Sequence, residues 1–267
     1  MRNFLSKVYS FGSSIPHRIM PNFLKRRADP ERFFIDQFVF EEISPNLKKT
    51  DRLLDAGAGS FRYRDALNNT VYESSDFAQA FDEASQGKHT YVCDICDIPV
   101  EDNTFDVVVS TQVIEHVPDP SGAIKEMSRV LKKGGRLYLT APQISPVHGR
   151  PYNFFFFTDI GLNKMFEDAS LDVISIKPRG GVFCVLAKIF SLFPTYIYYQ
   201  LAFTGFKRKI GFESKPKNLF LVALLFPIYF VFQIIVGYLI PFIFFYLDAL
   251  DKQKDYTLGY AVIGVKR

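Results

Sequence analysis

The sequence has few cysteines, and its first residues lack the long apolar run of a secretory signal. Its 267 residues include three cysteines, Cys93, Cys96 and Cys184. They are too few for a disulfide-stabilised scaffold and are typical of a chain in a reducing compartment. Serine, lysine and glycine interrupt the apolar residues near the start, so we identify no signal peptide. We therefore expect the globular part of the chain in the cytosol.

Charge is also missing from particular stretches. Residues 219–247 carry no charge, and residues 182–206 carry only Lys188. No acidic residue precedes Asp29, whereas six basic ones do: Arg2, Lys7, Arg18, Lys25, Arg26 and Arg27. The whole chain has a net charge of only +4, which is too small to indicate nucleic acid as a partner. With 22% charged and 48% hydrophobic residues, the chain is not disordered and can bury a sizeable core.

Short apolar strands alternate with amphipathic helices over most of the chain. The predicted strands are residues 52–55, 70–75, 90–93, 105–110, 136–140, 171–176 and 260–265. The predicted helices are residues 31–43, 120–131 and 158–169, with Thr158 as an N-cap. We expect Gly134 and Gly135 to end the second of these helices. The alternation predicts an α/β fold with a parallel, doubly wound sheet.

A glycine-rich turn follows the first predicted strand. The run Asp55-Ala-Gly57-Ala-Gly59 lets a ligand approach the backbone at the carboxyl end of a strand, although a plain tight turn uses the same residues. The third glycine of a dinucleotide fingerprint is missing, because Phe61 follows Ser60, and this disfavours NAD. Asp76 follows the second strand. It suits both hydroxyls of a ribose or, alternatively, the N-cap of a helix.

Six sequence blocks, in order, are similar to those of the class I S-adenosylmethionine-dependent methyltransferases, in particular the type 11 group. The blocks are LLDAGAG (53–59), Asp76, CDICDIP (93–99), FDVVVS (105–110), VIEHV (113–117) and VLKKGGRL (130–137). The resemblance covers about residues 49–177 and returns in the final strand. It implies a Rossmann-like seven-stranded sheet with helices on both faces, whose antiparallel last strand is residues 260–265.

The resemblance implies S-adenosyl-L-methionine as the cofactor, bound by seven residues: Asp55, Gly57, Gly59, Asp76, Asp94, Ile95 and Gln112. The first acid and the two glycines would line the methionine moiety. Asp76 would hold the ribose hydroxyls. Asp94 would accept the adenine amino group, while the backbone amide of Ile95 meets the ring. Gln112 would lie beside the donor methyl group.

We expect the acceptor side in the segment after the fifth strand. The run from Pro151 to Thr158 resembles the family's Pro-Tyr-Asp-Tyr-Phe-Arg-Tyr-Thr, but Phe156 replaces its arginine and Asn153 its aspartate, which favours a less polar acceptor. Methyl transfer depends mainly on positioning and desolvation, and a base matters chiefly for a hydroxyl acceptor. We predict His148 as the catalytic residue and Tyr152 as the second candidate.

Two patterns resemble parts of metal sites, and we predict no metal at either. Cys93 and Cys96 have the CxxC spacing, but no second such pattern supplies the other ligands, so we interpret them as small apolar fillers. Glu115 and His116 could bind a metal or act as a base, but one carboxylate and one imidazole make an incomplete metal site. A histidine that supports its loop is the simpler interpretation, and the metal option stays open.

The charge pattern divides the chain into three parts. Residues 1–45 form a basic, aromatic N-terminal helical segment. Residues 46–181 and 256–267 form the methyltransferase domain, and residues 182–255 form a hydrophobic insertion before the last strand. Within the insertion, five basic residues separate two apolar stretches: Lys207, Arg208, Lys209, Lys215 and Lys217.

The insertion begins and ends at the sheet, so both of its ends must lie on one side of a membrane. Residues 219–247 are too few to cross twice, since one span takes about 20 residues. Two spans, one from each stretch, would place the five basic residues on the outer side, against the positive-inside tendency. We therefore favour a monotopic insertion on the cytoplasmic face, with prolines bending residues 219–247 into a shallow hairpin. Two spans, a soluble lid and an oligomer interface remain alternatives.

These features predict a membrane-associated methyltransferase. Its partners would be an anionic membrane surface and a lipid-linked acceptor, such as a glycolipid, a polyprenyl-linked sugar or a quinone precursor. The alternatives are a methyltransferase for a soluble sugar or small metabolite, and a nonenzymatic scaffold that keeps the fold. An NAD-dependent oxidoreductase ranks last because the third glycine is lacking.

Overall fold

The computed structural model describes residues 19–77, 89–204 and 215–267, and the chain forms two compact units. One comprises residues 34–179 and 257–267; the other comprises residues 180–256 and the described residues before 34. Residues 34–45, which we expected in the N-terminal segment, are thus grouped with the sheet. Residues 1–18 and most of the basic loop lie outside the described residues.

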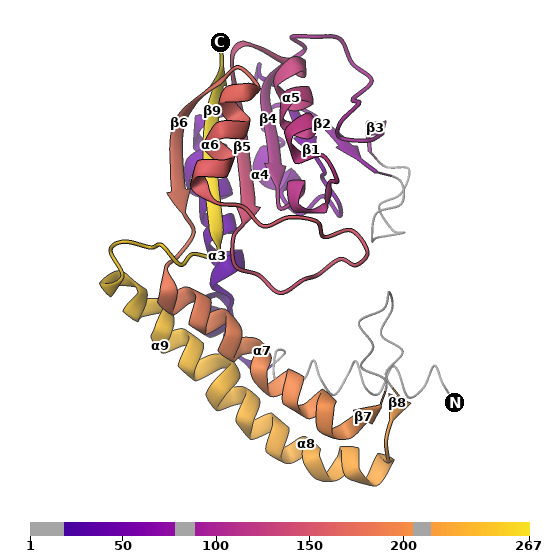
Figure 1. Cartoon of the computed structure of the whole chain (residues 1–267), viewed down its shortest axis with the longest axis vertical. Helices are drawn as coiled ribbons and strands as arrows, with labels where there is room; N and C mark the ends of the chain where they lie inside the picture. Colours follow the sequence, from indigo (N-terminus) through magenta and orange to yellow (C-terminus); the bar gives the residue numbers. More distant parts are fainter. Residues whose placement is uncertain (1–18, 78–88, 205–214) are drawn as a thin grey trace. The chain divides into compact units, whose positions relative to one another are not determined.

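The first unit is built on a seven-stranded sheet with the order β3-β2-β1-β4-β5-β9-β6 (Figure 1). β9 is antiparallel to both of its neighbours, β5 and β6, while the other neighbouring strands are parallel. This confirms the predicted fold. The strands are β1 (Arg52–Ala56), β2 (Val71–Asp76), β3 (Tyr91–Val92), β4 (Phe105–Thr111), β5 (Leu131–Pro142), β6 (Leu171–Pro178) and β9 (Gly259–Lys266).

Helices cover both faces of the sheet. Val108 points to one face and packs in a cluster with Ile124 of α5 (Pro120–Val130) and Leu162 of α6 (Asp159–Asp168). Val107 points to the other face, in a cluster with Ile43. That second face is covered by the end of α3 (Pro30–Gln37), the π-helical η1 (Phe38–Ile43) and α4 (Arg64–Leu67). Alternation along β4 therefore gives each face its own core, as expected for a strand buried on both sides.

Two short helices lie close to strand ends of this unit. They are η2 (Ser44–Asn46), which precedes β1, and η3 (Ile114–His116), which follows β4. The predicted cap of α6 is confirmed, because the Thr158 hydroxyl accepts a hydrogen bond from the Gly161 N–H at 3.1 Å. The chain therefore enters α6 at the residue that the sequence indicated.

The end of α5 differs from the prediction. The helix ends at Val130, and Leu131 is already extended, with φ −71° and ψ 141°. Leu131 pairs with Phe105, and the register of β5 against β4 then shifts before Arg136 pairs with Val107. Gly134, with φ +76°, lies in this irregular part of β5. The glycine pair therefore accommodates an irregularity within a strand, where left-handed backbone favours glycine, and does not end the helix.

The second unit contains a long antiparallel helical hairpin (Figure 1). Its first arm is α7 (Val182–Ala202), and its second is α8 (Leu219–Ile234), the π-helical η4 (Ile235–Leu239) and α9 (Ile240–Leu247). The ring of Phe190 in α7 contacts Phe244 of α9 at 5.6 Å, whereas Tyr198, two turns later, stacks on Tyr229 of α8 at 4.5 Å. The arms therefore run in opposite directions. Between them, β7 (Phe203–Thr204) pairs with β8 (Lys215–Pro216).

The shallow hairpin that we expected within residues 219–247 is wrong. Pro227 lies inside α8 without ending it, and Pro241 lies in the first turn of α9, after the π-helical segment. A proline in a first turn gives up an N–H that has no essential partner there, and π-helical segments absorb local strain. The helical path therefore continues to Leu247, and the reversal lies between α7 and α8.

Two further helices join the hairpin at the end where α7 begins and α9 ends. In α2 (Asn22–Ala28), Arg27 donates a hydrogen bond to the Tyr246 hydroxyl at 2.7 Å. Asp248, in η5 (Asp248–Leu250), accepts the N–H groups of Gly181 at 2.9 Å and Cys184 at 3.1 Å. This buried carboxylate caps the positive end of α7, which fixes the start of the hairpin.

Candidate active site

The predicted cofactor residues begin at the carboxyl end of β1, next to the end of β2. Gly57 donates its N–H to the Ser75 carbonyl at 2.9 Å, and Gly59 donates its N–H to Oδ2 of Asp76 at 2.7 Å. These bonds tie the glycine-rich turn to the last residues of β2. The structure therefore brings the turn and Asp76 together at one edge of the sheet, which is where open α/β sheets bind their ligands.

The two glycines of the turn differ in what surrounds them. Gly57 has φ +79°, and a Cβ built there would lie 2.5 Å from Cγ2 of Val113. Gly59 has φ +50°, but a Cβ there would meet nothing within 4 Å. Gly57 therefore permits close packing of the turn on the segment after β4. Gly59 leaves open space beside the backbone, which is available to a ligand.

Asp55 is a buried carboxyl group at the end of β1. Its Oδ2 accepts a hydrogen bond from the Tyr72 hydroxyl at 2.8 Å. Burial, and to a smaller extent the charge of Asp76, raises the pKa of Asp55 to about 7, although the Tyr72 hydrogen bond opposes the rise. At neutral pH the group is thus divided between its acid and its carboxylate. A ligand cation placed beside it would favour the carboxylate.

The segment after β3 carries the other predicted cofactor residues. Asp94 is exposed, and its Oδ1 accepts the Cys96 N–H at 2.9 Å, while Ile95 is buried in the core. Cys93 donates its N–H to the Asp76 carbonyl at 3.1 Å, so this segment begins next to Asp76. Burial, followed by the charge of Asp94, raises the pKa of the Cys93 thiol to about 11 and that of the Cys96 thiol to about 12. Both thiols are therefore neutral at physiological pH.

Gln112 occupies a strained position at the end of β4. Its φ of +56° is uncommon for a residue other than glycine. Thr140, in the neighbouring strand β5, holds it in place: the Gln112 N–H donates to the Thr140 carbonyl at 3.1 Å, and Nε2 donates to the Thr140 hydroxyl at 3.2 Å. Strained backbone of this kind clusters at functional sites, which supports the predicted position of Gln112 beside the reacting groups.

These residues fit a bound S-adenosylmethionine chemically. Asp76 uses one carboxylate oxygen for Gly59, which leaves the other for ribose hydroxyls. Asp94 is likewise exposed beside its single backbone contact. The open space at Gly59 and the ionisable Asp55 suit the amino-acid end of the cofactor, which carries an ammonium group.

The predicted catalytic residues lie in the loop between β5 and α6, against η3. Nε2 of His148 is 3.9 Å from Oε1 of Glu115, and Nε2 of His116 is 3.8 Å from the same oxygen. The His116 and His148 rings meet edge to face, with centroids 4.9 Å apart. Tyr152 contributes its carbonyl oxygen, which contacts Nδ1 of His116. The loop is held there because Phe154 donates its N–H to the Glu115 carbonyl at 2.8 Å.

We did not expect from the sequence that the side chains of Glu115, His116 and His148 would lie together. We interpreted Glu115 and His116 as an incomplete pair, and His148 as a separate base. Thirty-two residues separate the two histidines, so no spacing rule connects them. The signal available was that one group follows β4 and the other follows β5, since the carboxyl ends of neighbouring parallel strands lie at the same edge.

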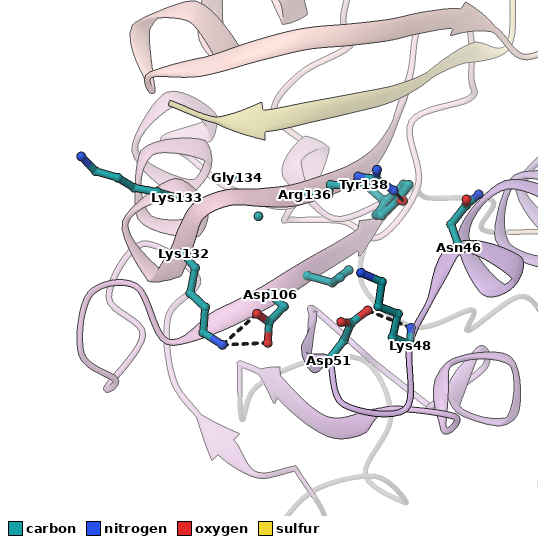
Figure 2. A pocket seen from close by; sticks show the side chains of 11 residues that line it. Asn46, Lys48, Asp51, Asp106, Lys132, Lys133, Gly134, Arg136 and Tyr138 are labelled. Carbon is teal, nitrogen blue, oxygen red and sulfur yellow. Dashed lines mark hydrogen bonds and ion pairs between the residues drawn. The ribbon is translucent and has the colours of Figure 1, made fainter.

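A surface hollow of about 280 Å³ lies at the opposite edge of the same sheet, and Figure 2 shows the side chains that line it. It is lined by residues at the amino ends of β4 and β5, among them Asp106, Lys133 and Arg136. In Figure 2, Lys132 extends to both carboxylate oxygens of Asp106, with Nζ 2.8 Å from each. The hollow is therefore separate from the predicted cofactor residues, which follow the carboxyl ends of the strands.

Comparisons with known proteins identify the same part of the chain. Residues 54–139 match a family model described as a methyltransferase domain. An uncharacterized protein of Methanocaldococcus jannaschii is 34% identical over 125 residues, which are 44% of this chain and 52% of that one. An uncharacterized methyltransferase of Schizosaccharomyces pombe is 32% identical over 108 residues, 33% of this chain and 39% of that one.

A demethylmenaquinone methyltransferase of Staphylococcus haemolyticus is also similar. It is 30% identical over 125 residues, which are 42% of this chain and 52% of that protein. The chain thus spans about half, or less, of the length of these curated relatives. The part that matches the family model contains the glycine-rich turn, β4 and most of β5.

Proposed function

We propose that this chain, which belongs to the class I S-adenosylmethionine-dependent methyltransferases, is a membrane-associated enzyme that methylates a lipid-linked acceptor. Family membership confirms the resemblance seen in the six sequence blocks and implies S-adenosylmethionine as the cofactor. The observation that carries the membrane part of the proposal is the helical hairpin of α7, α8 and α9, whose second arm exposes an apolar surface.

The cofactor supplies a methyl group activated on a sulfonium. Asp76 and Asp94 would hold the adenosine part, and Asp55 with the glycine turn would hold the amino-acid part. An acceptor hydroxyl must lose its proton as its oxygen takes the methyl group. We assign that proton to His148, with Tyr152 as the second candidate, because both lie in the loop against η3. Burial lowers the pKa of His116, so this ring is neutral at physiological pH and adds no positive charge beside the acceptor.

The outer surface of the hairpin is apolar along its whole second arm. Every exposed side chain in the described residues 220–247 is apolar, apart from the hydroxyl of Tyr246. Large side chains three or four positions apart form one continuous exposed stripe: Phe220, Leu224, Ile228, Val231, Ile235, Leu239, Ile243 and Leu247. A soluble protein rarely exposes so long a contiguous apolar surface, whereas a helix in lipid does.

The inside of the hairpin holds its polar groups. The Thr195 hydroxyl donates to Oε1 of Gln233 at 3.2 Å, and Nε2 of Gln233 donates to the Ser191 carbonyl at 3.3 Å. Gln233 is buried between the two arms. Polar side chains that bond across helices while apolar ones face outward are typical of helix pairs in membranes.

The lengths of the arms fit a bilayer. α7 has 21 residues and so is about 32 Å long, while the 29 residues from Leu219 to Leu247 span about 44 Å. The hydrocarbon layer is about 30 Å thick, and both arms are long and apolar enough to cross it. Because neither arm turns a broad polar face outward, of the kind that an interfacial helix needs, we favour two crossings over a shallow monotopic insertion.

Charge supports a cytoplasmic position for the catalytic domain. Three basic residues, Lys25, Arg26 and Arg27, lie in α2, beside the end of the hairpin from which the chain returns to the sheet. Together with Arg2, Lys7 and Arg18 in the sequence, they outnumber the five basic residues between α7 and α8. Two crossings therefore keep the larger positive charge on the cytoplasmic side.

The hairpin joins the sheet at the edge that carries the candidate active site. β6 ends at Pro178, opposite Tyr260, and β9 begins at Gly259, opposite Pro142 at the carboxyl end of β5. Both chain connections to the hairpin thus leave from the carboxyl edge.

The last part of the loop after β5 is rich in exposed phenylalanine, which favours a lipid acceptor over a free sugar. Phe154, Phe155 and Phe156 are 45%, 40% and 41% exposed, and three consecutive exposed rings form an apolar surface that a ligand can cover. Among the predicted acceptor classes, a quinone precursor suits this aromatic loop best. The name of the Staphylococcus haemolyticus relative, a demethylmenaquinone methyltransferase, supports the same choice.

The acceptor is tested by mass spectrometry of lipid extracts from cells with and without the active protein. We expect one lipid class to shift by the mass of one CH₂ group, and the Asp76→Ala variant to behave as the cells without the protein. A shifted soluble metabolite, with unchanged lipids, would instead support the small-molecule enzyme. If calorimetry with purified protein detects no S-adenosylmethionine binding, the nonenzymatic scaffold is supported.

Membrane insertion is tested by flotation with liposomes after alkaline carbonate washing, which releases peripheral proteins. Ile228 is the tenth of the 29 residues of the second arm and is 65% exposed, and Ile174 of β6 is 62% exposed in the sheet unit. A lysine in a membrane helix costs up to about 3 kcal/mol, the value at the centre of the bilayer. We expect Ile228→Lys to reduce flotation and the matched Ile174→Lys to leave it unchanged. Equal flotation of both variants, or release of the unmodified protein by carbonate, would contradict insertion.

A further inference from the structure

We propose that Glu115, His116 and His148 form a binding site for one divalent transition-metal ion, such as Zn²⁺, Mn²⁺ or Fe²⁺. One oxygen of Glu115 and one ring nitrogen of each histidine lie within 4.8 Å of one another. Two imidazoles and one carboxylate are a ligand set that these metals accept, and it leaves further coordination positions open. This inference goes beyond the proposed function, since it concerns a ligand that the methyltransferase fold does not require.

The distances suit a single ion between the three residues. Oε1 of Glu115 is 3.8 Å from Nε2 of His116 and 3.9 Å from Nε2 of His148. With the third side at most 4.8 Å, one point lies within about 2.5 Å of all three atoms. Metal–nitrogen and metal–oxygen bonds are about 2.0–2.2 Å long. Each ligand would therefore move by only a few tenths of an ångström.

Backbone carbonyl groups orient both imidazole rings. Nδ1 of His148 is 3.0 Å from the Pro146 carbonyl, and Nδ1 of His116 contacts the Tyr152 carbonyl. A carbonyl oxygen can only accept, so each neutral ring carries its proton on Nδ1 and presents the lone pair of Nε2 to Glu115. Metal-binding histidines are commonly held by the same arrangement, in which the other ring nitrogen donates to a carbonyl group.

Three hydrogen-bond acceptors therefore converge on one point. The two Nε2 lone pairs face a carboxylate oxygen, and at 3.8 and 3.9 Å neither pair is within hydrogen-bond distance. A cation between them would be attracted by all three groups, as in metal sites built from imidazoles and a carboxylate.

The exposed fractions of the three side chains show that the site opens on the side of the histidines. The Glu115 side chain is fully buried, while 21% of the His116 side chain and 43% of the His148 side chain are exposed. The carboxylate thus forms the floor and the histidines the rim, so the open coordination positions face outward. An oxygen of the acceptor could bind there and become more acidic, so that it would lose its proton to water; His148 would then hold the ion and would not take the proton itself.

Metal binding can be measured without cofactor or acceptor. Full-length protein in detergent is stripped of metal with a chelator and titrated by calorimetry with Zn²⁺, and separately with Co²⁺ while the absorption spectrum is recorded. We expect one ion per chain and a ligand-field absorption spectrum from bound Co²⁺. His148→Ala and Glu115→Gln should each weaken binding at least tenfold and abolish that spectrum.

Two control variants exclude other sites. His89→Ala removes a histidine outside the cluster, and Cys96→Ser removes half of the CxxC pattern; both should bind one ion as the unmodified protein does. Retained S-adenosylmethionine binding by each variant shows that it is folded. The proposal is overturned if the unmodified protein binds no ion, or if folded His148→Ala binds as tightly as the unmodified protein. Because no methyl transfer is measured, these outcomes do not depend on the proposed lipid acceptor.

Discussion

Replacing Asp55 with asparagine should stabilise the cofactor-free protein at alkaline pH. The carboxyl group is buried, and its pKa rises from 3.8 to about 7 in the folded chain. In the unfolded chain the group ionises near its ordinary value, so folding must oppose its ionisation at any pH above 4. The asparagine side chain would keep the shape and an oxygen that accepts the Tyr72 hydroxyl, but it cannot ionise.

The size of the effect follows from the shift in pKa. A rise of about 3 pH units corresponds to about 4 kcal/mol, at 1.36 kcal/mol for each unit. Because the folded-state pKa is raised, the contribution of this group to stability is complete below pH 4 and is lost as the pH rises towards 7. Asp55→Asn should therefore be up to about 4 kcal/mol more stable than the unmodified protein at pH 8. The gain should be less than half as large at pH 5.

Thermal melting followed by circular dichroism in a non-ionic detergent measures this difference between pH 5 and pH 8. For a chain of this size, 1 kcal/mol changes the melting temperature by roughly 2–4 °C, so a gain of about 4 kcal/mol corresponds to a rise of roughly 8–16 °C at pH 8. Tyr72→Phe is the matched control. It removes the hydrogen bond that lowers the pKa of Asp55, and it should destabilise the protein at pH 8. An Asp55→Asn gain that does not change with pH would refute the reasoning.

The same group makes cofactor binding depend on pH. If the cationic end of the cofactor binds the carboxylate, binding below pH 7 must first remove a proton from Asp55. The affinity measured by calorimetry should then be about tenfold weaker at pH 6 than at pH 8, and Asp55→Asn should bind weakly at both. An Asp55→Asn variant that binds as tightly as the unmodified protein at pH 8 would exclude this contact.

Three further changes test the remaining parts of the structure. Asp76→Ala removes the acceptor of the Gly59 N–H and the proposed ribose contact, so the cofactor affinity measured by calorimetry should fall at least tenfold. As the control, Asp97→Ala changes an exposed carboxylate and should bind the cofactor as the unmodified protein does. Gly57→Ala places a Cβ 2.5 Å from a neighbouring side chain at a positive φ, so it should lower the free energy of unfolding by about 1–3 kcal/mol. Gly59→Ala places its Cβ in open space and should lower the free energy of unfolding by less. Gln233→Leu removes a bond between the two arms of the hairpin and should lower the detergent melting temperature by a few degrees; an unchanged value would show that the bond is not needed.

Local patterns were sufficient for most of the sheet and for the cofactor residues. The apolar run around Val108 suits a strand buried on both faces, and the glycine turn after Asp55 follows from the conformations that glycine alone adopts freely. The structure places Asp76 beside that turn, as predicted. The exact end of α5 was not predictable, because Leu131 is drawn into β5 by its pairing with Phe105, a residue far away in sequence.

The course of the hairpin and the histidine cluster depend on contacts between distant residues. Prolines in residues 219–247 indicated a bend, but packing against α7 and the π-helical segment keep the second arm helical. Glu115 and His148 each follow a strand, and neither local sequence indicates that the two residues lie together. They meet because β4 and β5 are neighbours in the sheet and because Phe154 bonds to the Glu115 backbone. The amino-acid sequence thus determines which groups lie at the end of each strand. Which of those groups share one site depends on which strands are neighbours, and this is a property of the assembled sheet.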